Sequence, residues 1–517
     1  MSANTGTSAE SRPDRTTFGV ELEFLVPWLL DIVPDPLAKT KGLAPLFRVT
    51  RDSPDPEQDV HAAIRKLFEE HGLQTSVDIK SRKYSSAYAE KALHRYSAWT
   101  VKYDISVKEE DESNDWVRRY GWASVEVISL VEPTIPIAFE TLNYARQLLT
   151  NTFRCRVNKT CGLHVHVGKG AERFDLANMR RISALIWSSE HLFVNLNHPD
   201  RQANHLIPTA RKKTAISTGR GHGQHDNAKP GDPPDQCKDY LAKEVRYGEE
   251  PISFRDENRD LKIREAFATT REPGHYEPFQ WASPSGQLHD ADVPIDSMRS
   301  IDEEILGRIE KMSVKTDFEG FEEIESDPIR DRPSKRMENI RWSNDELEAM
   351  ALNPSQGINF HQFTNDPGVF EGVSQLYDSP SSCDIAWLMY PRGRGYVNFE
   401  LYNCDEFGYR GAGPRNSGRT IEFRGAEGTL DSWAITWAKI CVGMVRFALY
   451  APVDEFLRVL FKCDASNRDI EEFDCIDFLD EIGLPAEAVL AEKHLKEKEK
   501  EYKIKYVDES EQPKPPE

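Results

Sequence analysis

Hydrophobic and polar positions alternate most clearly in an early stretch of the chain, residues 17–24. Alternation places Phe18, Val20, Leu22 and Phe24 on one face of a predicted strand, and Glu21 and Glu23 on the other. Like charges side by side on a strand are unfavourable by roughly a few tenths of a kcal/mol unless a cation lies between them. The pattern therefore predicts a strand whose two neighbouring carboxylates a bound cation would stabilise.

Four further stretches alternate in the same way, and each carries acids, histidines or an acid with an arginine on its polar face. They are residues 98–107 with Asp104, 122–130 with Glu126, 161–168 with His164 and His166, and 420–425 with Glu422 and Arg424. A solvated sheet face normally mixes Thr, Lys, Gln and Ser with acids. If these strands form one antiparallel sheet, their carboxylates and imidazoles line a polar surface able to hold several divalent cations. A further strand is expected at residues 396–402.

Apolar residues recur at helical spacing between the predicted strands. This spacing predicts helices over residues 54–72, 136–153 and 430–450, and a long helix that Asp175 caps. The combination predicts an α+β fold, in which helices cover the apolar face of an antiparallel sheet.

The periodicity lapses in one long stretch. Residues 209–344 are rich in Gly, Pro and charged residues, which predicts a largely disordered or irregular insertion with short helices near residues 301–312. The insertion would divide one large domain into residues 16–208 and 345–487. Residues 1–15 are expected to be disordered, and residues 488–517 to form a charged, exposed helix that frays into a disordered tail.

Charge and composition exclude several classes of function. A net charge of -21 argues against a nucleic-acid partner, because binding to a polyanion depends on clustered Lys and Arg. The chain has no apolar run of about 18 residues and residues 1–15 are polar, so we expect no membrane span, no signal peptide and a cytoplasmic protein. The 8 cysteines include no CxxC pair and do not indicate a disulfide framework.

Taken alone, each polar motif has a plainer explanation. Glu21 and Glu23 could be solvent-exposed acids, Asp104 and Glu126 surface residues or caps, and Glu422 with Arg424 a structural ion pair. The two histidines could bind zinc with Cys155 and Cys161, although their spacing matches no common zinc module. The coincidence of all these groups on polar strand faces favours a functional site.

Residues 413–420 resemble a phosphate-binding loop in part. Their glycine spacing fits such a loop, but Arg419 stands where lysine is needed, and a strand pattern follows instead of a helix. We therefore exclude this stretch as a nucleotide site.

In order and spacing, the polar motifs resemble a family of amidoligases that is similar to the carboxylate-amine ligases of the glutamine synthetase and glutamate-cysteine ligase fold. The motifs are Phe18–Phe24, Gly162–Gly168, Thr420–Arg424 and Gly428–Asp431. The resemblance spans roughly residues 16–210 and 387–450. It implies an antiparallel sheet that forms a half-barrel cup, in which acidic residues bind Mg²⁺ around ATP.

The resemblance also implies roles for residues at matching positions. Metal ligands would be Glu21, Glu23, Glu126 and Glu422, joined by His164 or His166. Arg424 would contact the phosphates, and Arg201 with Asn204 would contact the nucleotide. Asp104 matches a position near the acceptor or the metal.

The implied function is an ATP- and magnesium-dependent ligase that joins a carboxylate to an amine through an acyl phosphate. Both reactants of the phosphoryl transfer are anions, which divalent ions and Arg can neutralise. Substrates could be small molecules, peptides or protein ends, and the sequence does not distinguish them. Two alternatives remain open: a metal-dependent hydrolase that uses the same His and carboxylate face, and a catalytically inactive scaffold.

Overall fold

The computed structural model describes most of the chain outside one long stretch and several shorter ones. The described residues are 16–76, 98–111, 114–170, 174–204, 206–218, 336–351, 366–379, 382–390, 394–402, 420–470 and 472–506. No helix within these ranges combines the length and the apolar character needed to cross a bilayer.

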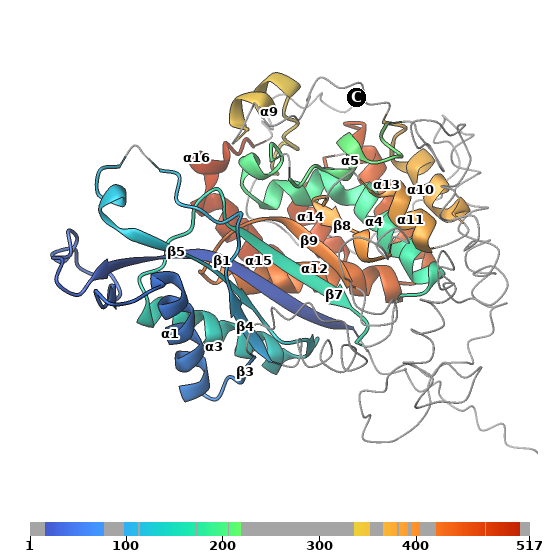
Figure 1. Ribbon diagram of the computed structural model, residues 1–517. Coiled ribbons are helices and arrows are strands. Elements are labelled where there is room, and N and C mark those ends of the chain that lie inside the picture. Colours follow the sequence, from blue (N-terminus) through green and yellow to red (C-terminus); the bar gives the residue numbers. More distant parts are fainter. Residues whose placement is uncertain are drawn as a thin grey trace, which may run out of the picture.

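A mostly antiparallel sheet of nine strands runs through the described part of the protein. The strands are β1 (Thr17–Leu30), β2 (Phe47–Val49), β3 (Thr75–Ser76), β4 (Trp99–Lys102), β5 (Gly121–Ile128), β6 (Glu132–Pro133), β7 (Gly162–Gly168), β8 (Val397–Asn398) and β9 (Thr420–Glu427). Their order is β3-β4-β5-β1-β7-β9-β8, and β2 and β6 pair with the two ends of β1. In Figure 1, β1, β7 and β9 lie side by side in the middle of the molecule.

The described helices pack on the sheet, on one another or on the connecting turns. They are α1 (Pro56–Glu70), α3 (Pro136–Thr152), α4 (Leu176–Phe193), α5 (Ala210–Lys213), α9 (Asn344–Met350), α10 (Val369–Asp378), α11 (Ser382–Leu388), α12 (Trp433–Tyr450), α13 (Val453–Asn467), α14 (Cys475–Glu481), α15 (Pro485–Glu497) and α16 (Glu499–Tyr502). Short 3-10 turns η1 (Val117–Arg119), η2 (Val194–Leu196), η3 (Pro199–Arg201) and η5 (Glu400–Tyr402) connect some of them. Helix α1 packs on β4 and β5, α12 on β7, and α4 on α10, α12 and α13.

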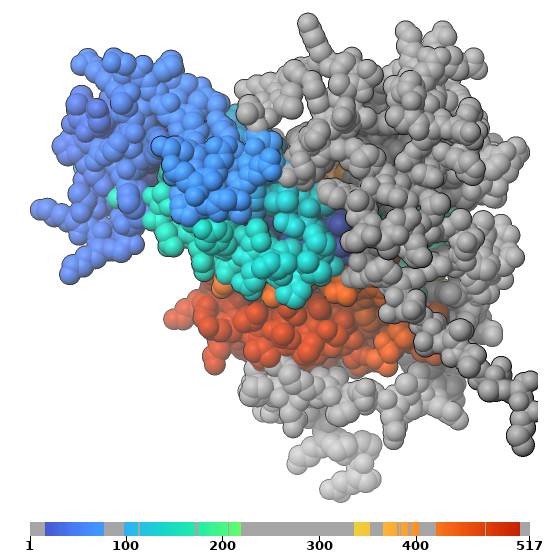
Figure 2. Space-filling model, turned by 90° about the horizontal axis from the view of Figure 1, so that it is seen from below, coloured from blue at the N-terminus to red at the C-terminus, as the bar shows by residue number. Residues whose placement is uncertain are grey.

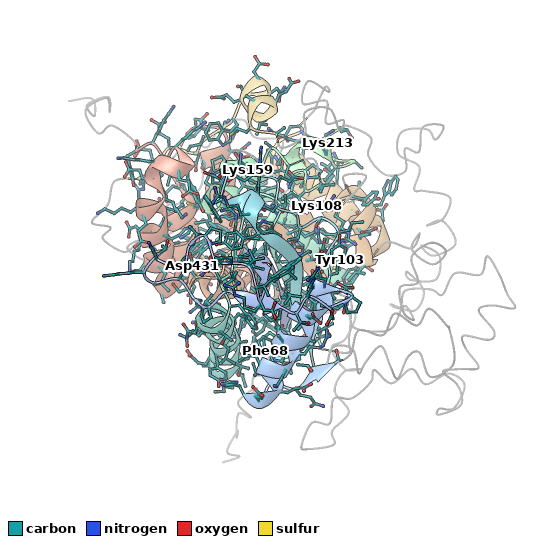
Figure 3. The ribbon with its side chains drawn as sticks, turned by 60° about the vertical axis from the view of Figure 1, so that its left-hand side comes forward. Phe68, Tyr103, Lys108, Lys159, Lys213 and Asp431 are labelled. Atoms are coloured by element: carbon teal, nitrogen blue, oxygen red, sulfur yellow. The ribbon has the colours of Figure 1, made fainter. Side chains whose placement is uncertain are left out.

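One hydrophobic core joins the N-terminal and C-terminal parts of the chain. Buried side chains from β1, α4, α12 and α14 belong to a single cluster. Figure 2 shows C-terminal segments (red and orange) directly against an N-terminal one (cyan), in agreement with the contacts between α12 and α3. In Figure 3 the side chains fill the space between the elements, with Phe68 of α1 low in the view. The two predicted halves of the domain therefore build one core.

The sequence patterns placed the main elements correctly. The four apolar side chains of residues 17–24 are 0–2% exposed, as alternation predicts. The carboxylate of Asp175 accepts a hydrogen bond from the Asn178 N–H and begins α4, as a good N-cap does. The α+β class is confirmed, with a mostly antiparallel sheet.

The strand predicted over residues 98–107 ends early, at Lys102. Asp104 Oδ1 accepts hydrogen bonds from the backbone N–H and the hydroxyl of Ser106, at 2.6 and 2.5 Å, and this side-chain turn replaces the extended backbone. Alternation over residues 98–107 predicts that Tyr103 and Ile105 share the apolar face with Trp99, but they are 47% and 74% exposed. That part of the prediction is wrong.

The strand predicted over residues 396–402 is also shorter than expected, because only Val397 and Asn398 pair with β9. Asn398 Oδ1 accepts a hydrogen bond from the Glu400 N–H at 2.9 Å, and the chain turns into η5. In both cases a short polar side chain bonds the backbone two residues further on, and this competes with strand pairing.

Regular structure extends into both ends of the predicted 209–344 insertion. Thr209 and Ile216 are buried, and Met337 packs against the core at the far end. The expected helices near residues 301–312 lie outside the described residues, as do residues 1–15 and 507–517.

The C-terminal helix has a buried side that the sequence reading did not predict. Ala488, Ala491 and Leu495 of α15 are at most 1% exposed, and α15 packs against α12 and α14. Tyr502 of α16 is 2% exposed and contacts Glu427 of β9. The stripe of Ala488, Ala491, Leu495 and Tyr502 is hard to recognise in a charged segment, because two of its four residues are small alanines.

Candidate metal centre

The polar face of the sheet gathers three potential metal ligands from three neighbouring strands. Glu21 of β1 pairs in register with His164 of β7, and His166 of β7 pairs with Glu422 of β9. One ligand atom each of Glu21, His164 and Glu422 lies within 4.8 Å of the others. We call these three residues the ligand trio.

Distances within the trio are short enough for shared binding of one ion. His164 Nδ1 lies 2.9 Å from Glu21 Oε2 and 3.9 Å from Glu422 Oε1. His164 and Glu422 are buried, and Glu21 is half-buried. A buried carboxylate is stable only when it is paired, hydrogen-bonded or bound to a metal.

The surrounding cations keep both carboxylates of the trio ionised. Burial alone would raise the pKa of Glu21, but the charge of His166 and the hydrogen bond with His164 outweigh it and hold this pKa well below its usual range. Burial likewise opposes ionisation of Glu422, yet His166 and Arg424 lower its pKa to about 2. Ionised carboxylates are the form that binds a divalent cation.

His166 adds a fourth possible ligand beside the trio. Its Nδ1 lies 3.0 Å from Thr420 Oγ1, and its Nε2 lies 3.3 Å from Glu21 Oε1 and 3.7 Å from Glu422 Oε1. This Nε2 is buried and makes no hydrogen bond of acceptable geometry in the structure. The orphaned nitrogen faces the carboxylates of Glu21 and Glu422, which would help to hold a cation.

Arg424 supplies a positive charge at the edge of the trio. Its Nη1 donates to Glu422 Oε1 and lies 3.5 Å from His164 Nδ1. Burial would lower the pKa of Arg424, but Glu422 and Glu21 raise it, so the guanidinium remains charged. The other oxygen of Glu422, Oε2, accepts a hydrogen bond from Asn398 Nδ2 at 2.9 Å.

Glu23 lies next to the trio and is fixed by the backbone of β7. Its Oε2 accepts a hydrogen bond from the Gly162 N–H at 2.6 Å, and its Oε1 lies 3.7 Å from His164 Nε2. Burial is the main reason that the pKa of Glu23 is raised. A Cβ on Gly162 would stand 2.7 Å from His164 Nε2 and 3.2 Å from Glu23 Oε2, so the close approach requires glycine.

Glu126 is on the same polar face but has a cation of its own. It lies opposite Glu23 in the β1–β5 pair, and its Oε2 lies 3.0 Å from Lys102 Nζ of β4. Burial and the charge of Glu21 raise the pKa of Glu126 well above its usual range. Asp104, just beyond β4, bonds Ser106, and hydrogen bonds with Ser106 outweigh burial and lower its pKa.

The two residues predicted to contact a nucleotide occupy the loop after α4. Arg201 is buried and donates to the backbone carbonyls of Gly425, Arg424 and Cys161. Asn204 is half-buried, and its Oδ1 accepts a hydrogen bond from the Leu206 N–H. The structure therefore brings together seven of the predicted residues on one sheet face, with Asp104 just beyond the end of β4. Arg201 contacts backbone carbonyls of that sheet, and Asn204 caps its own loop.

The donor set of the trio fits a divalent cation. Two ionised carboxylates and one or two imidazoles offer the oxygen and nitrogen ligands that Mg²⁺, Mn²⁺ or Zn²⁺ accept, and the carboxylates balance the charge of such an ion. Neither Cys155 nor Cys161 belongs to the trio: the Cys155 thiol contacts the carbonyls of Leu149 and Phe153, and the Cys161 thiol contacts Asn158 Oδ1.

Four residues of the site were not predicted from the sequence: Lys102, Gly162, Asn398 and Thr420. Lys102 could have been found, because it shares the polar strand face with Asp104. Gly162 and Asn398 act through contacts with residues more than 20 positions away, for which the sequence carries no local signal.

The fold and the site define an α+β protein with a candidate metal centre on the polar face of its sheet. Residues 14–217 match the family described as "Putative amidoligase enzyme", so the resemblance found from the motifs is confirmed over this segment. The segment contains Glu21, Glu23, Glu126, His164 and His166, whereas Glu422 and Arg424 lie beyond it. Searches of curated proteins and of solved structures returned no match to the chain.

Proposed function

We propose that this protein is an ATP- and magnesium-dependent ligase that joins a carboxylate to an amine through an acyl phosphate. The observation that carries the proposal is the ligand trio with Arg424 beside it, on strands of which two lie in the amidoligase match. An ion-binding carboxylate group next to a fixed guanidinium is the combination that phosphoryl transfer to an anion requires.

The proposed reaction has two steps. A carboxylate oxygen of the first substrate attacks the γ-phosphorus of ATP, and the bond to the bridging oxygen breaks to release ADP. The ammonium group of the second substrate first releases one proton to solvent, and the resulting amine nitrogen attacks the acyl carbon. Phosphate leaves with the electrons of the C–O bond and takes up the second proton that the nitrogen loses. The sum is an amide, ADP, phosphate and one proton.

The residues of the polar face divide this work. Glu21, His164 and Glu422, with His166, would hold magnesium, which when bound neutralises the phosphates and polarises the transferred group. Arg424 stabilises the negative charge on the phosphoryl oxygens from the side of β9. In this proposal the sheet forms one wall of a half-barrel cup, and its polar face is the concave side.

The remaining residues extend the proposal outward from the trio. Glu23 and Glu126 would hold further magnesium ions, and the ion pair between Lys102 and Glu126 would then be lost. Asp104 offers an ionised carboxylate at the edge of the sheet, which attracts the ammonium form of an incoming amine. Arg201 and Asn204 would face the nucleotide from the loop after α4.

The test is ADP release in the presence of Mg²⁺ and ATP, followed by mass spectrometry against a panel of amino acids, peptides and small carboxylates. Ligation is expected to need all three of ATP, a carboxylate and an amine. Turnover with zinc or manganese and without ATP would replace the proposal by a metal-dependent hydrolase. A protein that shows no thermal shift with any nucleotide is the inactive scaffold.

A further inference from the structure

Strand β9 contains a β-bulge at the residue that carries the site's guanidinium. Leu163 of β7 pairs with Ala426 and Val165 pairs with Phe423, so Arg424 and Gly425 together face the single residue His164. Bulges bend a strand and redirect its side chains, and they recur beside active sites. Here the bulge aims Arg424 at Glu422 and His164.

A bulge breaks the hydrogen-bond ladder, and the carbonyls of this one are bonded by Arg201. Arg201 Nη2 donates to the carbonyl of Arg424 at 3.0 Å, and Nε donates to the carbonyl of Gly425 at 3.2 Å. Buried carbonyls without a partner are costly, so these two bonds stabilise the bulged backbone over a regular strand. Arg201 is 6% exposed, which keeps water from replacing it.

The ring of Tyr396, just before β8, fills the space beside the bulge. A Cβ on Gly425 would stand 1.9 Å from the ring of Tyr396, so glycine is required for this packing. The hydroxyl of Tyr396 accepts a hydrogen bond from Asn197 Nδ2 at 2.9 Å. The bulge is therefore held by two side chains of the loop after α4, Arg201 directly and Asn197 through Tyr396.

Arg201 is connected to Glu23 as well. Its Nη1 lies 3.5 Å from the carbonyl oxygen of Cys161, and the N–H of the same peptide unit, on Gly162, donates to Glu23 Oε2. The Arg201 guanidinium thus contacts both the backbone of Arg424 and the peptide unit that binds the Glu23 side chain. The guanidinium hydrogen bonds of Arg201 within the described residues go to main-chain carbonyls.

We propose that Arg201 is a positioning residue: it holds the β9 bulge and so fixes the guanidinium of Arg424 against Glu422 and His164. The placement of Arg424 follows from the geometry alone, whereas its consequence for turnover rests on the proposed function. This role differs from the nucleotide contact implied by the family resemblance, because Arg201 acts through the backbone of another site residue.

The test is Mn²⁺ affinity, measured by the electron paramagnetic resonance of free Mn²⁺, in a double-mutant cycle of Arg201→Lys and Arg424→Met. Lysine keeps the charge but lacks the rigid planar fork with which Arg201 donates from two different nitrogens to the two bulge carbonyls. We expect Arg201→Lys to change the Mn²⁺ dissociation constant by more than about threefold when Arg424 is present, and by less than about twofold when it is Met. Equal effects in both backgrounds, or no effect in either, overturn the proposal.

Arg146→Lys is the matched control. Arg146 of α3 is half-buried and, like Arg201, donates to a backbone carbonyl, that of Leu430, at 2.8 Å, but it is not a residue of the site. Its replacement is expected to leave Mn²⁺ affinity unchanged. No nucleotide or substrate is present in these titrations, so their outcome stands even if the protein releases no ADP.

Where ADP release is measurable, kinetics separate positioning from nucleotide contact. A misplaced Arg424 is expected to lower kcat in Arg201→Lys with little change in KM for ATP, because the guanidinium acts on charge that develops in the transition state. A raised KM for ATP at unchanged kcat would show that Arg201 binds the nucleotide directly and would overturn the positioning role.

Discussion

At the residue scale, the trio of Glu21, His164 and Glu422 concentrates ionised groups in a largely buried place. The double variant Glu21→Gln with Glu422→Gln is expected to weaken Mn²⁺ binding by more than about a hundredfold, because loss of outer-shell partners alone typically weakens metal sites by 10- to 100-fold. Isothermal titration calorimetry measures the change. If the protein is a ligase, the double variant should also lose ATP turnover.

Glu132→Gln serves as the control for this double variant. Glu132 is half-buried and belongs to β6, which pairs with β1 but lies outside the ligand trio. Its replacement removes one carboxylate from the same sheet and should leave the Mn²⁺ affinity as it is. Wild-type affinity in the double variant would refute the trio as the metal centre.

A second residue-scale prediction concerns Glu190 of α4, which is 1% exposed. Its carboxylate accepts the N–H groups of Ala210 and Arg211, at 2.8 and 3.0 Å, but burial still raises its pKa to about 7. A folded-state pKa above the unfolded value means that this group's contribution is full below about pH 4.5 and is lost as the pH rises through about 7.

Glu190→Gln should therefore flatten part of the pH dependence of stability. A pKa difference of this size corresponds to about 3 kcal/mol. The wild-type unfolding free energy relative to that of the variant is expected to fall by up to this amount between pH 4.5 and pH 8. Urea unfolding at a series of pH values measures it, and a constant difference across the range would contradict the assignment.

At the element scale, two glycines on neighbouring strands offer a matched comparison. Gly162→Ala would place a methyl group 2.7 Å from His164 Nε2 and 3.2 Å from Glu23 Oε2, so β7 or both side chains must move. We expect weaker Mn²⁺ binding and a loss of stability of about 1–3 kcal/mol, as in other overpacked sites. Calorimetric titration and thermal unfolding report the two effects.

Gly19→Ala is the control for this variant. On β1, a Cβ at Gly19 would meet Ser129 Oγ at 3.7 Å and the Leu130 carbonyl oxygen at 3.8 Å, which are ordinary contacts. Its Mn²⁺ affinity should equal that of the wild type. If Gly162→Ala bound Mn²⁺ as well as Gly19→Ala does, the close packing of Glu23 on β7 would not matter for the centre.

Elements of this fold differ in how much of them the sequence predicts. The β1, β5, β7 and β9 strands follow from alternation, because each has one buried face, and the polar face they share could be predicted for the same reason. The strand ends near Asp104 and Asn398 could not be predicted, because the side chains of these two residues bond the backbone two positions further on and so compete with strand pairing. The bulge at Arg424 was also hidden, because it depends on Arg201, which is 223 positions away.

The same distinction applies to the site. Ionisable residues on the strands were found, but their partners Lys102 and Asn398 become visible only when neighbouring strands are aligned in register. Residue type and spacing predict which groups share a face. They do not predict that Glu126 is paired with Lys102 while Glu21 and Glu422 face each other across β7.

At the scale of the whole molecule, the family match and the folding unit do not coincide. Residues 14–217 end before β9, α12 and α13, yet β7 pairs with β9 and α4 packs against both helices. A fragment of residues 1–218 would expose the edge of β7 and one side of α4 to solvent, and it would lack Glu422. We expect it to show no cooperative unfolding and no Mn²⁺ binding.

Co-expression of residues 1–218 with residues 336–517 should restore both properties, because the two segments share one hydrophobic core and together supply the trio. Co-purification, a single cooperative thermal transition and a Mn²⁺ titration measure the outcome. The same pair with Glu422→Gln in the second fragment is expected to associate but to bind Mn²⁺ weakly, which separates assembly from ligation of the metal. Cooperative unfolding and full Mn²⁺ affinity of residues 1–218 alone would show that the centre is complete without β9.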